Sequence, residues 1–581
     1  MSPPSSDTPV VRTRGLVKRY GDLVAVDSVD LTVPAGDVYG LLGPNGAGKT
    51  TFMRMLFGLI RPDAGSVELF GREAVAGKVD ALRDVAGFVE TPRFYGYLSG
   101  RANLEILAEL DRRDGNGRID EVFEQVDLRE RADDKVREYS YGMVQRLGVA
   151  AALMRSPRLL VLDEPTNGLD PAGIRDMREL VRRLADEGIT ILLSSHNMLE
   201  VEEMCRDVAI MRRGRLAFTG SMQELRARAE EVQYRLVTSD DALAAEVAAN
   251  VDGARRGPVR LQARPGGAAH GRARQPGHRH PAARAAGHGA RDVVLPAHRD
   301  RRAGARAGGG VSMFASVYRV EMRKLLAQAR VRAVLGFLVV APWIYIGLIL
   351  HQDRLPLETL YGRYLKDTGY ATPLAILVYA SQWLLPLIAA LMAGDVFSSE
   401  DQGGTLKTIL TRSVDRTAVF WGKIAAAFTM TTAAVVTVAA SATLAGVVTV
   451  GADPLIDVGG TLRSSSSALG LVAASWASVL PATLGFAAIA MAVSILTRSS
   501  VLGVIVPVVL GLCMQLYTFL NAWDTVRHVL LGFTMSAWRG LLDSPSYAAP
   551  LTRGLLVAAV YLFVATAIGF VAFRRRDVAG G

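Results

Sequence analysis

The sequence contains very little cysteine: only Cys205 and Cys513 among 581 residues. Their wide separation argues against a disulfide framework and does not match the spacing of a zinc site. The first ten residues are polar and proline-rich, so the chain also lacks the apolar run of an N-terminal secretory signal peptide. We therefore expect the N-terminal part of the chain to stay in the cytoplasm.

Charged residues are scarce in long stretches of the second half of the chain. Six apolar runs there are each long enough to cross about 30 Å of hydrocarbon. They cover residues 333–350, 373–392, 424–450, 468–496, 501–519 and 555–573. The third and fourth are unusually long, which leaves room for an interfacial or re-entrant part. The near absence of charges within the runs argues against an ion pump built on buried carboxylates.

Lysine and arginine are distributed unequally between the two sides of these runs. If the N-terminal flank is cytoplasmic, thirteen of these residues lie on the inner flanks and seven on the outer ones. The excess follows the positive-inside rule. We therefore expect a multi-pass protein in the lipid bilayer of the cytoplasmic membrane, with both termini inside.

A single segment, residues 253–310, carries the positive balance of the chain. The whole chain has a net charge of +10, whereas this segment holds thirteen arginines against Asp292 and Asp300, a net +11. The rest is nearly neutral, so we expect no nucleic-acid partner. The segment has no hydrophobic periodicity and is predicted to be disordered. Anionic-lipid binding, a flexible tether, an inert linker and a frameshifted junction between two genes remain open.

The first half of the chain is organised around a glycine-rich loop. An apolar run, residues 38–42, reads as a buried strand before the loop, and residues 51–56 read as the start of a helix after it. Between a strand and a helix, such a loop cradles phosphate with its backbone N–H groups. Lys49 suits the β- and γ-phosphates and Thr50 suits Mg²⁺. The candidate ATP-binding residues of the loop are Gly43, Pro44, Asn45, Gly46, Ala47, Gly48, Lys49, Thr50 and Thr51.

Further polar residues follow predicted buried strands. Residues 159–162 lead into Asp163, suited to Mg²⁺, and Glu164, suited to act as general base on the water that attacks the γ-phosphate. Residues 191–195 lead into His196, and a short strand leads into Glu90. In α/β sheets, ligands bind at the carboxyl ends of the strands, so we expect a common site there.

Two other features are ambiguous when taken alone. Ser140 is a good N-cap for a helix that runs to about Met154, and a serine and a glycine at a helix start can bind an anion. An ordinary capped helix is the alternative. Tyr20 suits stacking on an adenine ring or, equally, a partly buried place in a strand.

Together these segments resemble the ATPase of an ABC transporter over about residues 10–235. The family's motifs occur in its order: Walker A at Gly43–Thr50, the signature at Ser140–Gln145, Walker B at Leu159–Glu164, the D-loop at Gly168–Asp170 and the switch histidine at His196. Tyr20 matches the position that stacks on adenine. The signature reads Ser-Tyr-Gly-Met-Val-Gln, and Glu90 replaces the Q-loop glutamine. Both variants resemble the drug and antibiotic exporter branch.

The resemblance implies that each ATP lies between Walker A of one ATPase domain and the signature of a second. Because the chain carries one set of motifs, we expect a homodimer with two composite sites, using ATP and Mg²⁺. The residues implied to contact ATP in trans are Ser140, Gly142, Gln145 and Asp170. Those implied to bind Mg²⁺ are Thr50, Asp163 and Glu90, and those implied to be catalytic are Glu164, His196 and Glu90.

The predicted organisation is an α/β P-loop ATPase domain over residues 1–240, a linker over 241–312 and an all-α permease of about six spans over 313–581. The loop Glu400–Leu410 resembles the coupling segment of ABC-2-type permeases. We expect it, together with Glu321–Gln328, to dock near Glu90.

The predicted function is an ATP-driven exporter of an unknown amphiphilic or hydrophobic, drug-like substrate. The alternatives are export of a lipid, peptide or polysaccharide, and ATP-dependent antibiotic sensing without transport. The six apolar runs argue against a non-transport ABC ATPase, such as a translation or repair factor.

Overall fold

The computed structural model describes residues 9–74, 80–111, 115–229, 309–352, 361–411, 415–456, 461–519, 524–542 and 547–575. The chain divides into two units, one made of Met1–Met222 with Gly308–Gly581 and the other of Gln223–Ala307. The predicted disordered linker over 241–312 lies outside the described residues as far as position 308. At its end, helix α9 begins at Gly309, ahead of the predicted boundary at Met313.

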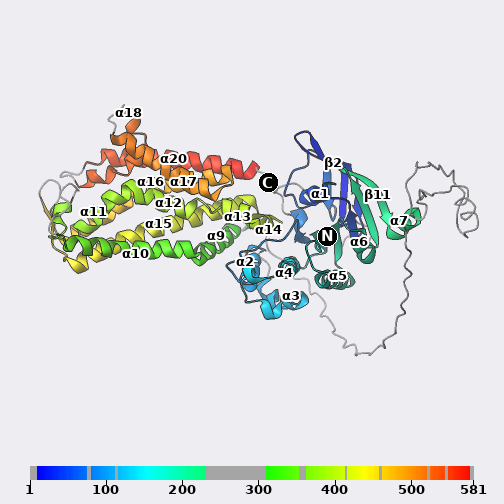
Figure 1. The fold of residues 1–581 in the computed structure, drawn as a ribbon. Coiled ribbons are helices and arrows are strands. Elements are labelled where there is room, and N and C mark those ends of the chain that lie inside the picture. Colours follow the sequence, from blue (N-terminus) through cyan, green and yellow to red (C-terminus); the bar gives the residue numbers. More distant parts are fainter. Residues whose placement is uncertain are drawn as a thin grey trace, which may run out of the picture. The chain divides into compact units, whose positions relative to one another are not determined.

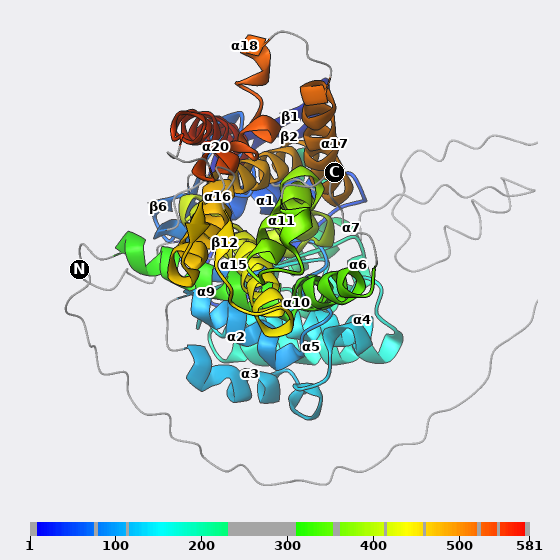
Figure 2. The ribbon, with the colours of Figure 1, turned by 90° about the vertical axis from the view of Figure 1, so that its left-hand side faces the viewer.

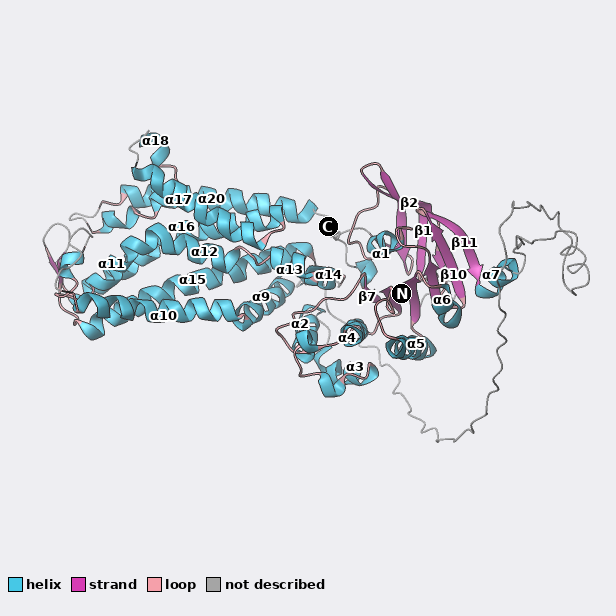
Figure 3. Ribbon diagram, viewed as in Figure 1, coloured by secondary structure: helices cyan, strands magenta, loops and turns pink. Residues whose placement is uncertain are grey.

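The N-terminal part is built on a six-stranded sheet in the order β11-β10-β4-β9-β8-β7 (Figures 1 and 3). Its strands are β4 (Val38–Leu42), β7 (Val85–Phe88), β8 (Leu159–Asp163), β9 (Thr190–Ser195), β10 (Asp207–Arg212) and β11 (Arg215–Ser221). All neighbours are parallel except β10 and β11. Every residue of β4, β8 and β9 is buried, as their apolar sequences predict for strands covered on both faces. The α/β fold class predicted for this region is therefore correct.

A second, antiparallel sheet precedes and follows the glycine-rich loop in the sequence. It contains β1 (Val11–Tyr20), β2 (Leu23–Val29), β3 (Thr32–Val33), β5 (Ala64–Leu69) and β6 (Arg72–Glu73). The apolar positions Val29, Leu31 and Val33 alternate as in one strand, but the structure splits them, with Val29 in β2 and Val33 in β3. The split occurs where the backbone N–H of Gly15 donates to the Asp30 carboxylate at 2.6 Å.

The α-helices of this part lie between the strands in the sequence, except the last, which follows β11. They are α1 (Lys49–Leu56), α2 (Gly100–Asp111), α3 (Ile119–Gln125), α4 (Tyr141–Leu153), α5 (Pro171–Asp186), α6 (Met198–Met204) and α7 (Met222–Ala229). Two of them begin at the caps that the sequence favours, because Ser140 accepts from the Met143 N–H and Asp170 accepts from the Gly173 N–H.

The C-terminal part is almost entirely helical, and all six apolar runs form helices long enough to cross a membrane. The spans are α10 (Ala329–Leu350), the segment Ala371–Gly403, α15 (Arg416–Thr449), α16 (Ser465–Thr497), α17 (Ser500–Phe519) and α20 (Ala549–Arg575). The second span contains α11 (Ala371–Tyr379), a π-helical turn (Ala380–Leu384), α12 (Leu385–Ala393) and α13 (Ser398–Gly403). The remaining described elements are α9 (Gly309–Ala327), α14 (Thr405–Leu410), α18 (Asp524–Arg527), α19 (Leu531–Thr534), two 3-10 helices (Gly362–Tyr364 and Ala537–Leu541) and a short hairpin of β12 (Leu455–Ile456) and β13 (Leu462–Arg463).

The two longest spans, α15 and α16, have 34 and 33 residues. Each is one unbroken helix, so the re-entrant break considered for these runs is absent. The two helices pack against each other, α15 also packs on α9 and α10, and α16 also packs on α17 and α20 (Figure 2). Each of the two longest spans therefore contacts several other helices of the C-terminal part.

Candidate active site

The glycine-rich loop lies between β4 and α1, where the sequence places it. Gly48 has a φ of +105°, in the region that favours glycine, and a Cβ there would lie 2.3 Å from the Ala25 carbonyl oxygen. Only glycine fits this close approach. The loop therefore turns sharply into α1, so that the N-terminus of the helix points at the space above the strand ends.

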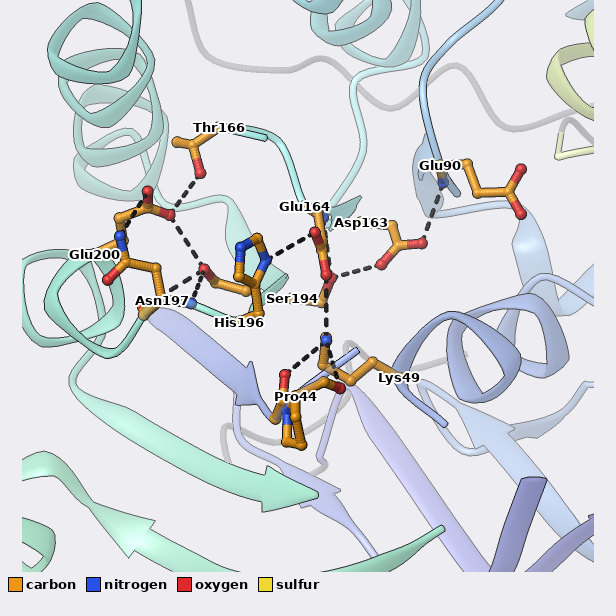
Figure 4. Close-up of polar contacts among 12 residues, drawn as sticks. Pro44, Lys49, Glu90, Asp163, Glu164, Thr166, Ser194, His196, Asn197 and Glu200 are labelled. Atoms are coloured by element: carbon orange, nitrogen blue, oxygen red, sulfur yellow. Dashed lines mark hydrogen bonds and ion pairs between the residues drawn. The ribbon is translucent and has the colours of Figure 1, made fainter. Parts of the chain in front are cut away.

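Lys49 is almost completely buried, with 4% of its surface exposed. Its ammonium donates to the carbonyl oxygens of Gly43 at 2.7 Å and Pro44 at 3.3 Å, and it pairs with Glu164 at 3.2 Å (Figure 4). The other carboxylate oxygen of Glu164 lies 3.0 Å from Nδ1 of His196. The structure therefore joins the predicted phosphate-binding lysine, general base and histidine in one chain of contacts.

Asp163 is buried next to this group at the end of β8. One carboxylate oxygen accepts from Ser194 Oγ at 2.5 Å and the other from the Glu90 backbone N–H at 3.2 Å. Burial raises the pKa of Asp163, while hydrogen bonds from Ser194 and Thr50 act in the opposite direction. The carboxylate is therefore held in a fixed position between β8, β9 and α1.

Ser194 and Glu200 belong to the site but were not predicted from the sequence. Ser194 Oγ also accepts from the Glu164 backbone N–H at 2.9 Å, so this residue orients both acids. The buried Glu200 carboxylate accepts from Thr166 Oγ1 at 2.6 Å and from Ser195 Oγ at 3.1 Å. The sequence signal for these contacts was the pair of hydroxyl residues, Ser194 and Ser195, at the end of an otherwise apolar strand, because buried polar groups need partners.

Glu90 lies at the same sheet edge, but only its backbone contributes to the Asp163 network. Its φ is +64°, and its side chain points away from Asp163 and Glu164 in Figure 4. There it pairs with Arg54 of α1 and with Lys407 of α14, the latter at 2.5 Å. The expected Mg²⁺ and catalytic role of the Glu90 carboxylate stays a prediction.

The signature and D-loop residues contact each other and their own helices. Tyr141 lies beside Gly168, and its hydroxyl lies 2.7 Å from Thr91 Oγ1 and accepts from Gln145 Nε2 at 3.3 Å. Gln145 is buried, with 1% of its surface exposed. The in-trans contacts of Ser140, Gly142, Gln145 and Asp170 with ATP remain predictions. Tyr20 ends β1 with 38% of its surface exposed, and the Lys18 ammonium lies over its ring, 5.6 Å from the centroid.

The predicted coupling segment contacts the ATPase part near Glu90. In addition to the Lys407 pair, Thr408 Oγ1 donates to the Arg93 carbonyl oxygen at 3.0 Å. Gly404, which separates α13 from α14, has a φ of +72° and lies against the Arg93 side chain. The expected docking of the loop is therefore present in the structure.

Helix α9 makes a second set of contacts with the ATPase part. Arg319 and Arg323 pair with Glu109 of α2 at 3.3 and 3.2 Å. The ammonium of Lys324 lies over the Tyr95 ring, 4.8 Å from its centroid. The expected participation of the segment before the first span is therefore also present.

Comparison with known proteins agrees with this geometry. The ABC transporter family matches residues 26–167, and the ABC-2 family transporter proteins match residues 318–514. The bacitracin transport ATP-binding protein BcrA of Bacillus licheniformis is 47% identical over 208 residues, which are 36% of this chain and 68% of that protein. This chain belongs to the ABC transporter family.

The names of two further relatives state a resistance or a transport function. The daunorubicin resistance ATP-binding protein DrrA3 of Streptomyces coeruleorubidus is 40% identical over 216 residues, 37% of this chain and 68% of that protein. The lantibiotic transport ATP-binding protein SrtF of Streptococcus pyogenes is 38% identical over 207 residues, 36% of this chain and 89% of that protein. The ABC transporter described here thus combines an ATP-hydrolysing domain and a multi-pass ABC-2 permease in one chain.

Proposed function

We propose that this ABC transporter is a homodimeric exporter that moves an amphiphilic or hydrophobic, antibiotic-like compound out across the cytoplasmic membrane. Residues 1–240 serve as its ATPase, 241–312 as a linker and 313–581 as its permease. The contact between Glu90 and Lys407 is the observation that carries the proposal, because it links an edge of the ATP site to a loop of the permease within one chain.

The ATPase chemistry follows from the contacts of Glu164. A carboxylate at hydrogen-bonding distance from a water can orient it and accept its proton during attack on the γ-phosphate. His196 holds Glu164 from one side, and the Ser194 hydroxyl holds its backbone N–H. Lys49 exchanges its bonds to the Gly43 and Pro44 carbonyl oxygens and to Glu164 for bonds to phosphate oxygens. That exchange frees the Glu164 carboxylate to act as base.

Magnesium fits the oxygen groups next to Lys49. Thr50 offers a hydroxyl and Asp163 a carboxylate, and the two side chains are close enough for Thr50 to lower the pKa of Asp163. Mg²⁺ favours a site with one or two protein oxygens plus phosphates and water. Among the described residues there is no cluster of three or more His, Cys, Asp or Glu side chains that would form an independent metal cage. Thr50 and Asp163 would therefore hold the ion, which neutralises phosphate charge when bound.

The likeness to bacitracin, daunorubicin and lantibiotic proteins favours an antibiotic-like cargo. The spans agree with this, because they have few charges, and a pathway of that composition suits amphiphilic compounds better than ions. The excess of lysine and arginine on the inner flanks favours ATPase domains and both termini in the cytoplasm.

Transport by inside-out vesicles provides the test. Inside-out vesicles are prepared from cells that express the full-length protein, and ATP-dependent accumulation of daunorubicin is monitored by the fluorescence of the drug. Growth protection of the same cells against bacitracin is measured in parallel. Glu164→Gln serves as the ATPase-dead control. We expect accumulation with the wild type and none with the control.

The outcomes distinguish the alternatives. Protection without accumulation of any compound, but with ATP hydrolysis that the drugs stimulate, would support a sensing complex in place of an exporter. Accumulation of labelled lipid or peptide, but of neither drug, would retain export and replace the cargo class. ATP hydrolysis with neither protection nor accumulation of any tested class would overturn the proposal.

A further inference from the structure

Four buried ionised side chains meet where helices α9, α13 and α15 approach one another. Glu321 and Lys324 come from α9, Glu400 from α13 and Lys423 from α15, and none exposes more than 4% of its surface. We call these four residues the buried ion cluster. Lys423 lies 2.9 Å from Glu321 and 2.7 Å from Glu400, Lys324 lies 2.6 Å from Glu321, and Lys324 also pairs with Glu400.

The cluster links its three helices through four ion pairs. Taking four charges out of water is expensive, and the cost is offset only when each charge keeps its partners in good geometry. Because the two acids and two lysines balance, every displacement of one helix relative to the others would leave a buried charge uncompensated. The helices are therefore expected to move together near the cluster.

One member of the cluster also bonds to the ATPase part. Tyr95 donates its hydroxyl hydrogen to Glu400 at 2.6 Å. Burial and the nearby Glu400 charge raise the pKa of Tyr95 well above 10, so the hydroxyl stays a donor at physiological pH. A bond from a hydroxyl to a carboxylate is about twice as strong as one between neutral groups.

Tyr95 is in turn fixed to helix α2. Its backbone N–H donates to Asn103 Oδ1 at 2.8 Å, and Asn103 Nδ2 donates to the Tyr95 carbonyl oxygen at 3.1 Å. Asn103 lies on α2 and is buried, with 2% of its surface exposed. A movement of α2 therefore moves Tyr95, and with it the end of the bond to Glu400.

We propose that Tyr95 is a coupling residue, which transmits the movement of α2 to α9, α13 and α15 through Glu400 and the buried ion cluster. The inference rests on the proposed function and adds a contact separate from that of Glu90 and Lys407. A cavity of about 210 Å³ next to the cluster, lined by Phe94, Tyr97 and Gln328 among others, gives the connection room to shift.

The test uses Tyr95→Phe, which removes the hydroxyl and keeps the ring under Lys324. Tyr97→Phe is the matched control, because Tyr97 lines the same cavity and its hydroxyl interacts with Gln328, whereas that of Tyr95 bonds to Glu400. The reporter is Cys513 of α17, which is exposed, whereas Cys205 is buried. Helix α17 packs against α12 and α13, so a bimane maleimide on Cys513 senses movement of the second span.

Both the ATP-dependent change in bimane fluorescence and the ATP hydrolysis rate are measured on full-length protein in lipid nanodiscs. We expect Tyr95→Phe to hydrolyse ATP at a rate close to that of the wild type. Its ATP-dependent fluorescence change should be smaller than that of the wild type by a factor of about five or more. Tyr97→Phe should keep both. A double variant, Lys324→Met with Glu400→Gln, removes one charge of each sign and should show the same loss as Tyr95→Phe.

Three results would count against the inference. A full fluorescence change in Tyr95→Phe overturns it, and so does a proportional loss of ATP hydrolysis, because Tyr95 would then only support the ATPase fold. If the wild type itself shows no ATP-dependent change and no drug accumulation, the proposed function fails, and the inference fails with it. A responsive wild type beside a responsive Tyr95→Phe leaves the proposed function intact.

Discussion

Lys407 Nζ donates to the Glu90 carboxylate at 2.5 Å, although the two residues are 317 positions apart in the sequence. The same carboxylate pairs with Arg54 of α1, and the Glu90 backbone N–H donates to Asp163. Glu90 thus contacts the helix that follows the phosphate loop, the Walker B acid and the permease. A carboxylate at this position, in place of a glutamine, adds charge to the contact with two cations.

Lys407→Met should uncouple ATP hydrolysis from transport. The variant leaves Glu90 with Arg54 and removes the charged link to α14, so we expect drug accumulation to fall about tenfold, with a smaller effect on basal ATP hydrolysis. Lys407→Arg should restore most of the coupling. Thr408→Val on the same helix removes a neutral hydrogen bond to Arg93 and should change accumulation by less than about threefold. Equal losses in the methionine and valine variants would contradict a special role for the charge.

Glu164→Gln should abolish ATP turnover and preserve ATP binding. The amide keeps the shape of the side chain and loses the proton-accepting group, so we expect the rate to fall about 10²–10⁴-fold. Glu187→Gln, on the exposed end of α5, is the control and should match the wild type. Steady-state hydrolysis and filter binding of radiolabelled ATP measure both effects. A normal turnover rate in Glu164→Gln would exclude Glu164 as the base.

Composite sites predict complementation between two inactive variants. Lys49→Ala disables phosphate binding, and Ser140→Arg blocks the signature, so each homodimer should be inactive. Coexpression gives mixed dimers that retain one intact site, and roughly a quarter of the wild-type rate should return if the two types of chain pair at random. Complete inactivity of purified mixed dimers would refute composite sites, and full ATPase activity of protein that light scattering shows to be monomeric would refute pairing.

Ser194→Ala should lower the affinity for Mg²⁺ in addition to lowering the stability of the fold. Its hydroxyl donates to Asp163 and accepts from the Glu164 N–H, and leaving buried partners unsatisfied costs about 1–3 kcal/mol. We expect a higher Mg²⁺ concentration for half-maximal hydrolysis and a lower Tm. Ser195→Ala, which loses contact with Glu200 instead, should lower the Tm and leave the Mg²⁺ requirement unchanged. The same Mg²⁺ shift in both variants would exclude specific positioning by Ser194.

Gly48→Ala should impair ATP binding more than Gly46→Ala. Both glycines have positive φ, and each alanine carries a backbone strain of about 1–2 kcal/mol. Only at Gly48 would the added Cβ also collide with the Ala25 carbonyl oxygen, whereas nothing lies within 4 Å at Gly46. Titration with a fluorescent ATP analogue and thermal unfolding compare the variants. Equal affinities would show that the loop relaxes around the collision.

Several elements could be predicted from local sequence alone. The strand–loop–helix around Lys49, the acids after β8 and the six spans depend on hydrophobic runs, glycines and their order, which act over a few residues. The sequence also predicted the length of α15 and α16, but it did not predict that each is one unbroken helix. A re-entrant stretch and a long tilted helix have the same composition, and only packing against neighbouring helices distinguishes them.

What the sequence by itself determined is the chemistry available at each position: a phosphate loop, carboxylates after buried strands, and long apolar helices with few charges. Only the tertiary structure decided which of these groups meet. Glu90 turned its carboxylate to Arg54 and Lys407, Ser194 joined Asp163, and Tyr95 reached Glu400. Such contacts join residues up to hundreds of positions apart, and their partners are selected by burial and charge compensation, which no local pattern encodes.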